Sequence, residues 1–374
     1  TTSYNPAAPR PMDEVRENML ERARQPRNPF NFTNFEEVAP VIKGLQSTDR
    51  DAWAVAFSAL AAPYEEKAAR AEEAGDAKEA KENFLIAYDY HHVARYPAAN
   101  SPGKLDSYRR SQENYLSAAR YFDQPITRVE VPVPAASGDP AIWFYRRPTG
   151  VERPPVVVTW GGIDSFKEER HQDAQYLDAG LATLAIDMPG VGDAPISGSK
   201  TGERLWDAIF DWIDGQPDLD NTRVGIAGGS TGGYWATKVA HTHRDRICVA
   251  VNHGGPAHYA FTPEWIARAQ RGEYPLELAE TLASAFGLST YDEWVEYSPQ
   301  LSLLDQGIIN EPCAPLLLLN GVNDSVFPIA DMHILLEHGD AKQARFSQGA
   351  HMGGGGLGWA GLAWLKQHLL GEAV

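Results

Sequence analysis

Gly228-Gly229-Ser230-Thr231-Gly232 joins an apolar run, Arg223–Ala227, to a segment of helical composition, Gly233–His241. A Gly-x-Ser-x-Gly motif between a strand and a helix is typical of a nucleophile elbow. The turn is so tight that both flanking positions require glycine, and the serine is left exposed at the end of its strand. We expect the backbone N–H of Thr231, at the start of the helix, to help hold a developing oxyanion. The alternative is a glycine-rich turn without chemistry.

Two downstream residues supply the base and the acid that a catalytic serine needs. Asp324 follows the apolar run Pro315–Asn320, and His351 lies in a loop after the short strand-like segment Ala344–Ser347. The order Ser, Asp, His along the chain is that of the α/β-hydrolase triad. Because each residue falls where a predicted strand ends, we predict that Ser230, Asp324 and His351 are catalytic.

Each of these residues also has a structural alternative. Asp324 alone fits a cap of the helix that begins near Pro328, and His351 alone is one of 11 histidines. Asp187, in the segment Asp187–Gly192, is a rival acid. It precedes the serine, which is the wrong order, and its Asp-x-Pro-Gly-x-Gly setting favours a structural turn after a strand. Asp324 is therefore the preferred acid.

The loop after the predicted strand Val156–Trp160 carries Gly161, Gly162, Ile163 and Asp164. The α/β-hydrolase fold places its second oxyanion donor in this loop. Glycines let the backbone approach a substrate closely, so we predict that the N–H of Gly162 or Ile163 completes the oxyanion hole with Thr231. An ordinary tight turn is the alternative.

Composition and charge agree with a globular enzyme. The chain has 374 residues, 43% of them hydrophobic, which is enough for a sizeable core. The formal net charge is −17, which disfavours nucleic acid and anionic membranes as partners on electrostatic grounds, and a small-molecule substrate is expected. Residues 1–125 hold 16 basic and 19 acidic side chains, so the rest of the chain carries −14 of that charge and disfavours strongly anionic substrates.

Cysteine usage and the chain's beginning favour a cytoplasmic protein. Cys248 and Cys313 lie far apart in the sequence, and neither belongs to a metal-binding spacing or a disulfide framework. No metal or organic cofactor is expected. Thr1–Pro6 shows no basic stretch followed by an apolar one, and no apolar segment reaches transmembrane length. The oligomeric state stays open, with a homodimer among the alternatives.

The sequence pattern changes near residue 125. Residues 1–125 show helical periodicity, as in Trp53, Phe57 and Leu60 at i, i+4 and i+7, whereas strands and helices alternate through residues 126–374. Alternation predicts a doubly wound, mostly parallel sheet, interrupted by a helical, aromatic-rich insertion at about 254–312. The expected strands are 129–133, 141–145, 156–160, 181–187, 223–228, 247–252, 315–320 and 344–347, and helical composition covers 49–60, 68–90, 105–122 and about 357–369.

Three segments together carry a resemblance to one branch of the α/β-hydrolases: Trp160–Glu169, Asp187–Gly192 and Gly228–Gly233, combined with the helical first third. That branch contains fermentation–respiration switch esterase-like proteins, dihydroxypseudooxynicotine hydrolase, and fungal polyketide-shortening hydrolases of the yellowish-green pigment type. The resemblance covers nearly the whole chain. It implies an α/β-hydrolase fold with a helical N-terminal domain, residues 1–125, acting as a lid over the active site. Some members cleave carbon–carbon bonds beside a carbonyl, and others resemble esterases.

Five further side chains are candidates for substrate binding. Trp160 and Trp235 flank the oxyanion donors and the serine, where an aromatic substrate would find ring faces. Tyr90 and His91 end a helix of the first domain, which faces the catalytic centre by analogy with the branch. His253 follows a predicted strand on the side where active-site loops emerge. A packing role is the alternative for each of them.

These residues predict a serine hydrolase that cleaves an ester, amide or carbamate bond of a small aromatic molecule through an acyl-enzyme. A first alternative is carbon–carbon bond hydrolysis of a β-dicarbonyl or acyl-aromatic compound, whose carbanion leaving group needs an added proton donor. A second alternative is a non-catalytic regulatory or partner-binding protein on a hydrolase scaffold. The presence of all three triad members counts against this second alternative.

Overall fold

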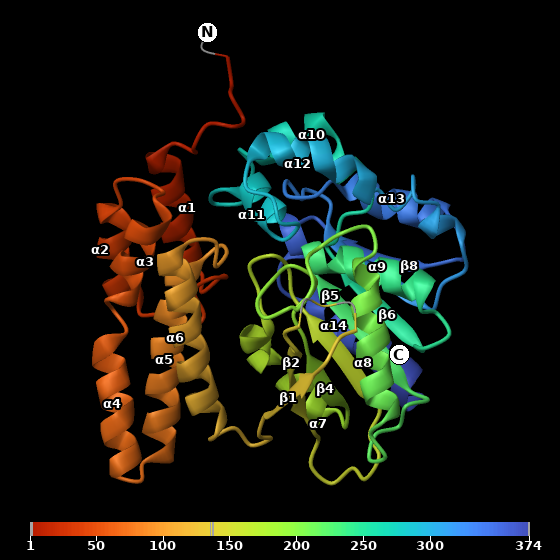
Figure 1. Cartoon of the computed structure of the whole chain (residues 1–374), viewed down its shortest axis with the longest axis horizontal. Coiled ribbons are helices and arrows are strands. Elements are labelled where there is room, and N and C mark those ends of the chain that lie inside the picture. Colours follow the sequence, from red (N-terminus) through yellow and green to blue (C-terminus); the bar gives the residue numbers. More distant parts are fainter. Residues whose placement is uncertain (1–2, 135, 137, 373–374) are drawn as a thin grey trace. The chain divides into compact units, whose positions relative to one another are not determined.

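The computed structural model describes residues 3–134, 136 and 138–372 (Figure 1). The chain divides into two compact units. The helical unit comprises Thr1–Ile126 together with Pro275–Leu278, and the sheet unit comprises Thr127–Tyr274 together with Ala279–Val374. The four residues Pro275–Leu278 therefore belong with the first unit although they lie in the second part of the sequence.

Helices account for the regular structure described in the helical unit, and the extensive contact between α5 and α6 dominates its packing. Alanines pack tightly where helices approach one another, as at Ala68, Ala80 and Ala118, all of which are fully buried. The helices are α1 (Met12–Arg24), α2 (Phe35–Gly44), α3 (Arg50–Ser58), α4 (Ala62–Glu73), α5 (Ala77–Arg95) and α6 (Pro102–Ala119).

The stretch of helical composition at 68–90 contains a break that its composition does not show. Helix α4 ends at Glu73, and α5 begins at Ala77. Gly75 between them has a φ of +73°, a conformation that glycine adopts without strain. The side chain of Asp76 accepts a hydrogen bond from the N–H of Glu79 and so caps the second helix. The glycine turn and the aspartate cap therefore divide this region into two helices, α4 and α5.

One sheet forms the centre of the sheet unit, and its strand order is β1-β2-β4-β3-β5-β6-β7-β8. Strand β1 pairs antiparallel with β2, and β2 pairs antiparallel with β4. The remaining neighbours, in the order β4-β3-β5-β6-β7-β8, pair in parallel. The predicted doubly wound, mostly parallel sheet is confirmed. The strands are β1 (Thr127–Val131), β2 (Ala141–Arg146), β3 (Val156–Trp160), β4 (Ala182–Ala185), β5 (Val224–Gly229), β6 (Val249–His253), β7 (Leu316–Gly321) and β8 (Gln343–Ser347).

Helices cover both faces of the central strands, and for this reason those strands read as continuous apolar runs. The α-helices of this part of the chain are α7 (Ala174–Asp178), α8 (Leu205–Asp214), α9 (Thr231–Thr242), α10 (Pro263–Ala269), α11 (Leu278–Ser284), α12 (Tyr291–Tyr297), α13 (Ile329–Glu337) and α14 (Leu357–Leu370). Short 3-10 helices lie at η1 (Lys167–Asp173), η2 (Gly202–Arg204), η3 (Tyr259–Phe261), η4 (Ser298–Leu301), η5 (Ile308–Asn310) and η6 (His351–Gly353).

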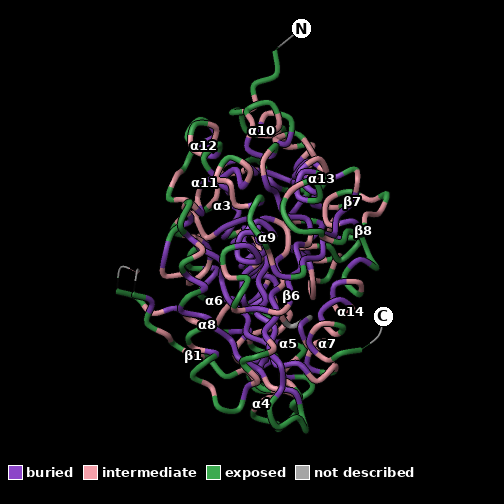
Figure 2. The backbone as a smooth tube through the Cα atoms, turned by 90° about the vertical axis from the view of Figure 1, so that its right-hand side faces the viewer, coloured by how far each residue is buried: buried purple, intermediate pink, exposed green. Residues whose placement is uncertain are grey.

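Strand β5 shows how its two faces are used. Gly225 packs against Leu365 and Leu369 of α14, whereas Gly228 approaches the backbone of Gly232 in α9. Positions 225 and 228 point to opposite faces because side chains alternate along a strand. Helices α14 and α9 therefore cover opposite faces of β5. Figure 2 shows that the residues of β6 and α9 are largely buried.

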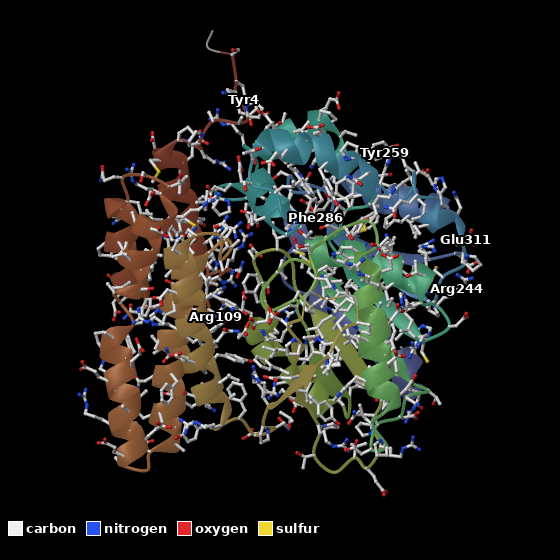
Figure 3. The ribbon with its side chains drawn as sticks, in the orientation of Figure 1. Tyr4, Arg109, Arg244, Tyr259, Phe286 and Glu311 are labelled. Carbon is white, nitrogen blue, oxygen red and sulfur yellow. The ribbon has the colours of Figure 1, made fainter. Side chains whose placement is uncertain are left out.

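The segment between β6 and β7 is a helical insertion with an aromatic interior. It contains α10, α11 and α12, which lie in the predicted interval 254–312. The ring of Phe286 contacts those of Trp294 and Tyr297, with centroids 5.3 and 5.6 Å apart. Tyr259 is 43% exposed; it and Phe286 are labelled in Figure 3. Across the described part of the chain, no helix combines the length and hydropathy needed to span a bilayer.

Candidate active site

Ser230 occupies a strained turn between β5 and α9. Its φ is +52° and its ψ is −130°, a region that non-glycine residues rarely adopt. The N–H of Ser230 donates to the carbonyl of His253 at 2.8 Å, which ties the turn to the end of β6. A strained serine between a buried strand and a helix is the geometry of a nucleophile elbow.

The glycines on either side of Ser230 are sterically required. A Cβ at Gly228 would lie 2.3 Å from the carbonyl oxygen of Gly232. A Cβ at Gly232 would lie 2.1 Å from the carbonyl oxygen of Gly161, in the loop after β3. Both distances are far below a van der Waals contact, so the motif needs glycine because backbone meets backbone at this point.

We expect Gly232→Ala to displace the Gly161 loop and to reduce both stability and turnover. Overpacking of this kind costs about 1–3 kcal/mol of unfolding free energy. Displacement of the loop beside Ser230 is expected to lower kcat/KM about 100-fold. Thermal unfolding and steady-state kinetics measure the two effects. The matched control is Gly358→Ala in α14, where an added Cβ meets nothing within 4 Å. Equal kinetics for both variants would contradict the steric argument.

Three side chains from the ends of three strands form a hydrogen-bonded run. The Nε2 atom of His351 lies 2.7 Å from the hydroxyl oxygen of Ser230. The Nδ1 atom of His351 lies 2.7 Å from Oδ2 of Asp324. Because an ionised carboxylate only accepts, Nδ1–H is the donor to Asp324, and Nε2 is left to accept the Ser230 proton. The parallel order of β5, β7 and β8 brings these residues to one edge of the sheet.

The carboxylate of Asp324 is buried and fully engaged. Its Oδ1 accepts hydrogen bonds from the N–H groups of Val326 and Phe327 at 2.7 and 2.9 Å. Its Oδ2 accepts from the side-chain amide of Asn320 at 2.8 Å, in addition to His351. The N–H groups bound to Oδ1 precede α13, which begins at Ile329, so the helix-cap alternative does not describe this contact.

Asn320 is a residue that sequence reasoning did not single out. Its amide nitrogen holds Asp324, and its Oδ1 accepts the N–H of Met352 at 3.0 Å. One side chain therefore links the loop of the acid to the loop of the histidine. The available signal was a lone polar residue at the carboxyl end of the otherwise apolar strand Leu316–Gly321.

The loop after β3 lies against the nucleophile. A Cβ at Gly162 would lie 2.9 Å from Cβ of Ser230 and 3.4 Å from the backbone nitrogen of Thr231. Thr231 begins α9, so its N–H has no carbonyl four residues earlier within the helix to bind. Ile163 follows in the same loop and is buried. The structure thus places Gly162 and Thr231 beside Ser230, in positions suited to an oxyanion hole.

Comparison with known proteins places this architecture in a family. A model of the FrsA-like esterases matches residues 42–348. The chain belongs to the FrsA-like esterase family. The resemblance drawn from the three sequence segments is therefore confirmed, and the chain is an α/β hydrolase by fold and family.

Curated relatives and solved structures agree with this assignment. The α/β hydrolase ucsC of Acremonium sp. is 30% identical over 251 residues, which cover 60% of this chain and 51% of that protein. The 2,6-dihydropseudooxynicotine hydrolase of Paenarthrobacter nicotinovorans is 28% identical over 235 residues, covering 61% and 59%. The crystal structure of 2,6-dihydroxy-pseudo-oxynicotine hydrolase superposes with a TM-score of 0.72 at 25% identity, covering 86% of this chain and 90% of that one. The chain spans little more than half the length of these two curated relatives.

The surroundings of His351 set its pKa in this FrsA-like protein. Burial by itself lowers the pKa of His351, but the carboxylates of Asp324, Glu273 and Asp164 outweigh it and raise the pKa above its ordinary value. A base must be neutral to accept a proton, and a raised pKa keeps the imidazole protonated to a higher pH. The acidic limb of a reaction that uses this base therefore lies above the ordinary pKa of histidine.

Asp187, the rival acid, binds a lysine. Its Oδ1 accepts the N–H of Lys167, and its Oδ2 accepts from Nζ of Lys167 and from the N–H of Asp193, all at 2.9 Å. Burial, opposed by Lys167 and reinforced by the carboxylates of Glu168 and Asp193, raises the pKa of Asp187 to about 6. These contacts hold the turn after β4 and favour the structural interpretation of Asp187.

The candidate tryptophans and His253 are engaged in packing and backbone contacts. Trp160 donates from Nε1 to the carbonyl of Gly232 at 2.8 Å, and its ring lies 4.9 Å from that of Trp206. Trp235 stacks on the same neighbour, Trp206, with centroids 5.8 Å apart. Both are 1% exposed. His253 donates from Nε2 to the carbonyl of Met352 at 2.8 Å. Substrate contact by these three residues stays a prediction.

Tyr90 and His91 are fully buried and bind neighbours within the helical unit. The hydroxyl of Tyr90 donates to the carboxylate of Glu37 at 2.8 Å. The ring nitrogens of His91 lie 3.2 Å from the hydroxyl of Ser58 and 3.1 Å from the carboxylate of Glu65. These bonds account for the polar atoms of both side chains. Their role in substrate binding, like the lid role of residues 1–125, stays a prediction from the resemblance.

Proposed function

We propose that this FrsA-like chain is a serine hydrolase that cleaves an ester, amide or carbamate bond of a small aromatic molecule through an acyl-enzyme. The observation that carries the proposal is the run of two 2.7 Å contacts from Ser230 through His351 to Asp324. It begins at a strained serine with obligatory glycine neighbours. A nucleophile, a base and an orienting acid in this arrangement are the parts that acyl transfer needs.

In the first step, Ser230 attacks the substrate carbonyl while Nε2 of His351 takes the hydroxyl proton. Negative charge develops on the carbonyl oxygen, and the N–H groups of Thr231 and of Gly162 or Ile163 stabilise it. The imidazolium that forms is stabilised by Asp324, whose oxygens are held in place by hydrogen bonds from backbone and side-chain donors.

In the second step, His351 gives its proton to the leaving group, and the acyl-enzyme remains on Ser230. A water molecule then attacks the acyl carbon while His351 takes its proton, and the bond to Ser230 breaks as His351 returns that proton to the serine oxygen, which releases the acid. The same oxyanion donors serve both steps, because each passes through a tetrahedral intermediate at the same carbon.

Carbon–carbon bond hydrolysis of a β-dicarbonyl or acyl-aromatic compound is the second candidate. The leaving group is then a carbanion, which needs a proton donor in addition to the triad. Tyr274 supplies an O–H group near this site: its hydroxyl donates at 2.9 Å to Oδ2 of Asp164, which lies two residues after Gly162. This observation keeps the second candidate open to test.

A substrate panel with identified products distinguishes the two candidates. Aryl esters, anilides, aryl carbamates and aryl 1,3-diketones are offered to the wild-type chain, and products are separated and identified by mass. We expect turnover of aryl esters with a burst of the aryl product and an acyl adduct on Ser230. Cleavage confined to the 1,3-diketones would transfer the assignment to carbon–carbon hydrolysis. Absence of turnover and of any adduct across the panel would contradict both candidates.

A further inference from the structure

Glu273 lies in the insertion between β6 and β7 and binds the backbone of His351. Its Oε1 accepts the N–H of His351 at 2.9 Å. This hydrogen bond is made to the main chain of His351. Both ring nitrogens of the same histidine have other partners, Ser230 and Asp324. It therefore fixes where the ring is anchored without occupying either nitrogen.

The second oxygen of the same carboxylate binds the residue after the triad acid. Oε2 of Glu273 accepts the N–H and the hydroxyl of Ser325 at 3.0 and 2.7 Å. The N–H of Glu273 donates back to the hydroxyl of Ser325 at 2.9 Å. Gly272 packs so closely that an added Cβ would lie 2.8 Å from that hydroxyl. One carboxylate thus joins the loop of Asp324 to the loop of His351.

The next residue reaches the third loop of the site. The hydroxyl of Tyr274 donates to Asp164, on the loop that carries Gly162. Two consecutive residues of the insertion therefore contact the acid loop, the histidine loop and the oxyanion loop. These loops follow three different strands, and the insertion adds contacts between them to those that Asn320 of β7 makes with the acid and histidine loops.

We infer that Glu273 is a positioning residue for the triad: it holds His351 and Asp324 in register, and its negative charge favours the imidazolium. This inference rests on the proposed function, because it assigns a role to the same base. A short charge-assisted network at several donors is stronger and more directional than neutral hydrogen bonds, so it resists small rotations of the loops. A misplacement of about 1 Å in a catalytic base costs about 100-fold in rate.

The charged and titratable groups around the imidazole are few and can be separated. Asp324 binds Nδ1 directly, Glu273 binds the main chain, and Asp164 and His253 act at longer range. The edge of the Phe327 ring packs against the imidazole with centroids 5.6 Å apart. Replacing Glu273 keeps the side chain of Asp324, so the contribution of the second carboxylate can be measured with the triad acid still present.

The test compares Glu273→Ala, Glu273→Gln and the control Glu280→Gln. Glu280 lies on the same insertion and accepts from the side chain of Gln270, whereas Glu273 binds His351 and Ser325. For each full-length variant, kcat and KM are measured across pH on an aryl ester, with the rate of fluorophosphonate labelling of Ser230 and the melting temperature as companion readouts.

We expect Glu273→Ala to lower kcat about 100-fold with little change in KM, because the base is misplaced in every step. In Glu273→Gln, one amide oxygen can still accept a hydrogen bond, so the loss in kcat is smaller. Both variants move the acidic limb of kcat/KM to lower pH, since the imidazolium loses a nearby negative charge. Glu280→Gln keeps the wild-type profile.

Two outcomes would overturn the inference. One is an unchanged acidic limb and unchanged kcat in both Glu273 variants. The other is a fall in kcat that matches a fall in melting temperature while the limb stays in place, which indicates a structural role alone. Failure of the proposed function has a different signature, because Ser230 of the wild-type chain would then not be labelled at any pH.

Discussion

Replacement of Ser230 by alanine is expected to lower kcat by about 10⁶-fold and to abolish labelling by a fluorophosphonate probe. The reason is that the hydroxyl of Ser230 lies 2.7 Å from Nε2 of His351, on the strained turn where attack takes place. Without this oxygen, no acyl-enzyme forms, and only binding and oxyanion stabilisation remain. Steady-state kinetics and mass mapping of the labelled peptide measure the two effects.

Ser284→Ala is the matched control for this experiment. The hydroxyl of Ser284 donates to the carbonyl of Thr281 within its own helix, so its removal leaves the elbow intact. The control is expected to label at Ser230 and to turn over substrate as the wild type does. Normal turnover by Ser230→Ala would eliminate the acyl-enzyme mechanism, whatever the labelling shows.

Asp324→Asn is expected to lower kcat by about 10⁴-fold while the protein stays folded. An amide can present an N–H group to Nδ1 of His351, which then has to accept, so the imidazole takes the tautomer that cannot receive the Ser230 proton. The amide oxygen can still accept from the N–H groups of Val326 and Phe327, and so the loop is retained. Single-turnover kinetics and circular dichroism together separate lost chemistry from lost structure.

Asp187→Asn is the comparison that decides between the two acids. Lys167 is fully buried and pairs with Glu168 and Asp193 as well as with Asp187, so Asp187→Asn leaves its charge compensated but removes hydrogen-bond acceptors from the turn after β4. Loss of a hydrogen bond to a charged group costs about 1.5–3 kcal/mol, and we expect a lower melting temperature as the main effect. If a well-folded Asp187→Asn variant is inactive and Asp324→Asn is not, the assignment of the acid is reversed.

The strand-to-helix turn and the parallel sheet could be predicted from local sequence. The tight elbow demands glycine at 228 and 232, and the apolar runs at Val156–Trp160 and Leu316–Gly321 reflect strands covered on both faces. Gly75 is a residue typical of turns and so indicates the break between α4 and α5, but the alanine-rich helical composition on either side obscured this signal. These features depend on neighbours within a few residues, so one sequence contains them.

The contacts that hold the candidate site together depend on the tertiary structure. Ser230, Asp324 and His351 were chosen by order and by strand ends, but the 2.7 Å contacts between them follow from how three loops meet. Glu273 had no local signal that distinguished it from other polar residues, and the one signal for Asn320 was its place as a lone polar residue at the end of an apolar strand. Glu273 binds the backbone of His351, 78 residues away in the sequence, and Asn320 binds the backbone of Met352, 32 residues away.

Local periodicity and motif chemistry thus determined the elbow, the order of the catalytic candidates and the parallel sheet, because glycine sterics and alternation of side chains act along the chain. The direction of each side chain was decided only in the folded protein. Trp160 and Trp235 illustrate this: their positions beside the serine were evident in the sequence, yet their rings pack around Trp206. The contacts that a ring or a carboxylate makes depend on neighbours that the fold brings from distant segments of the chain.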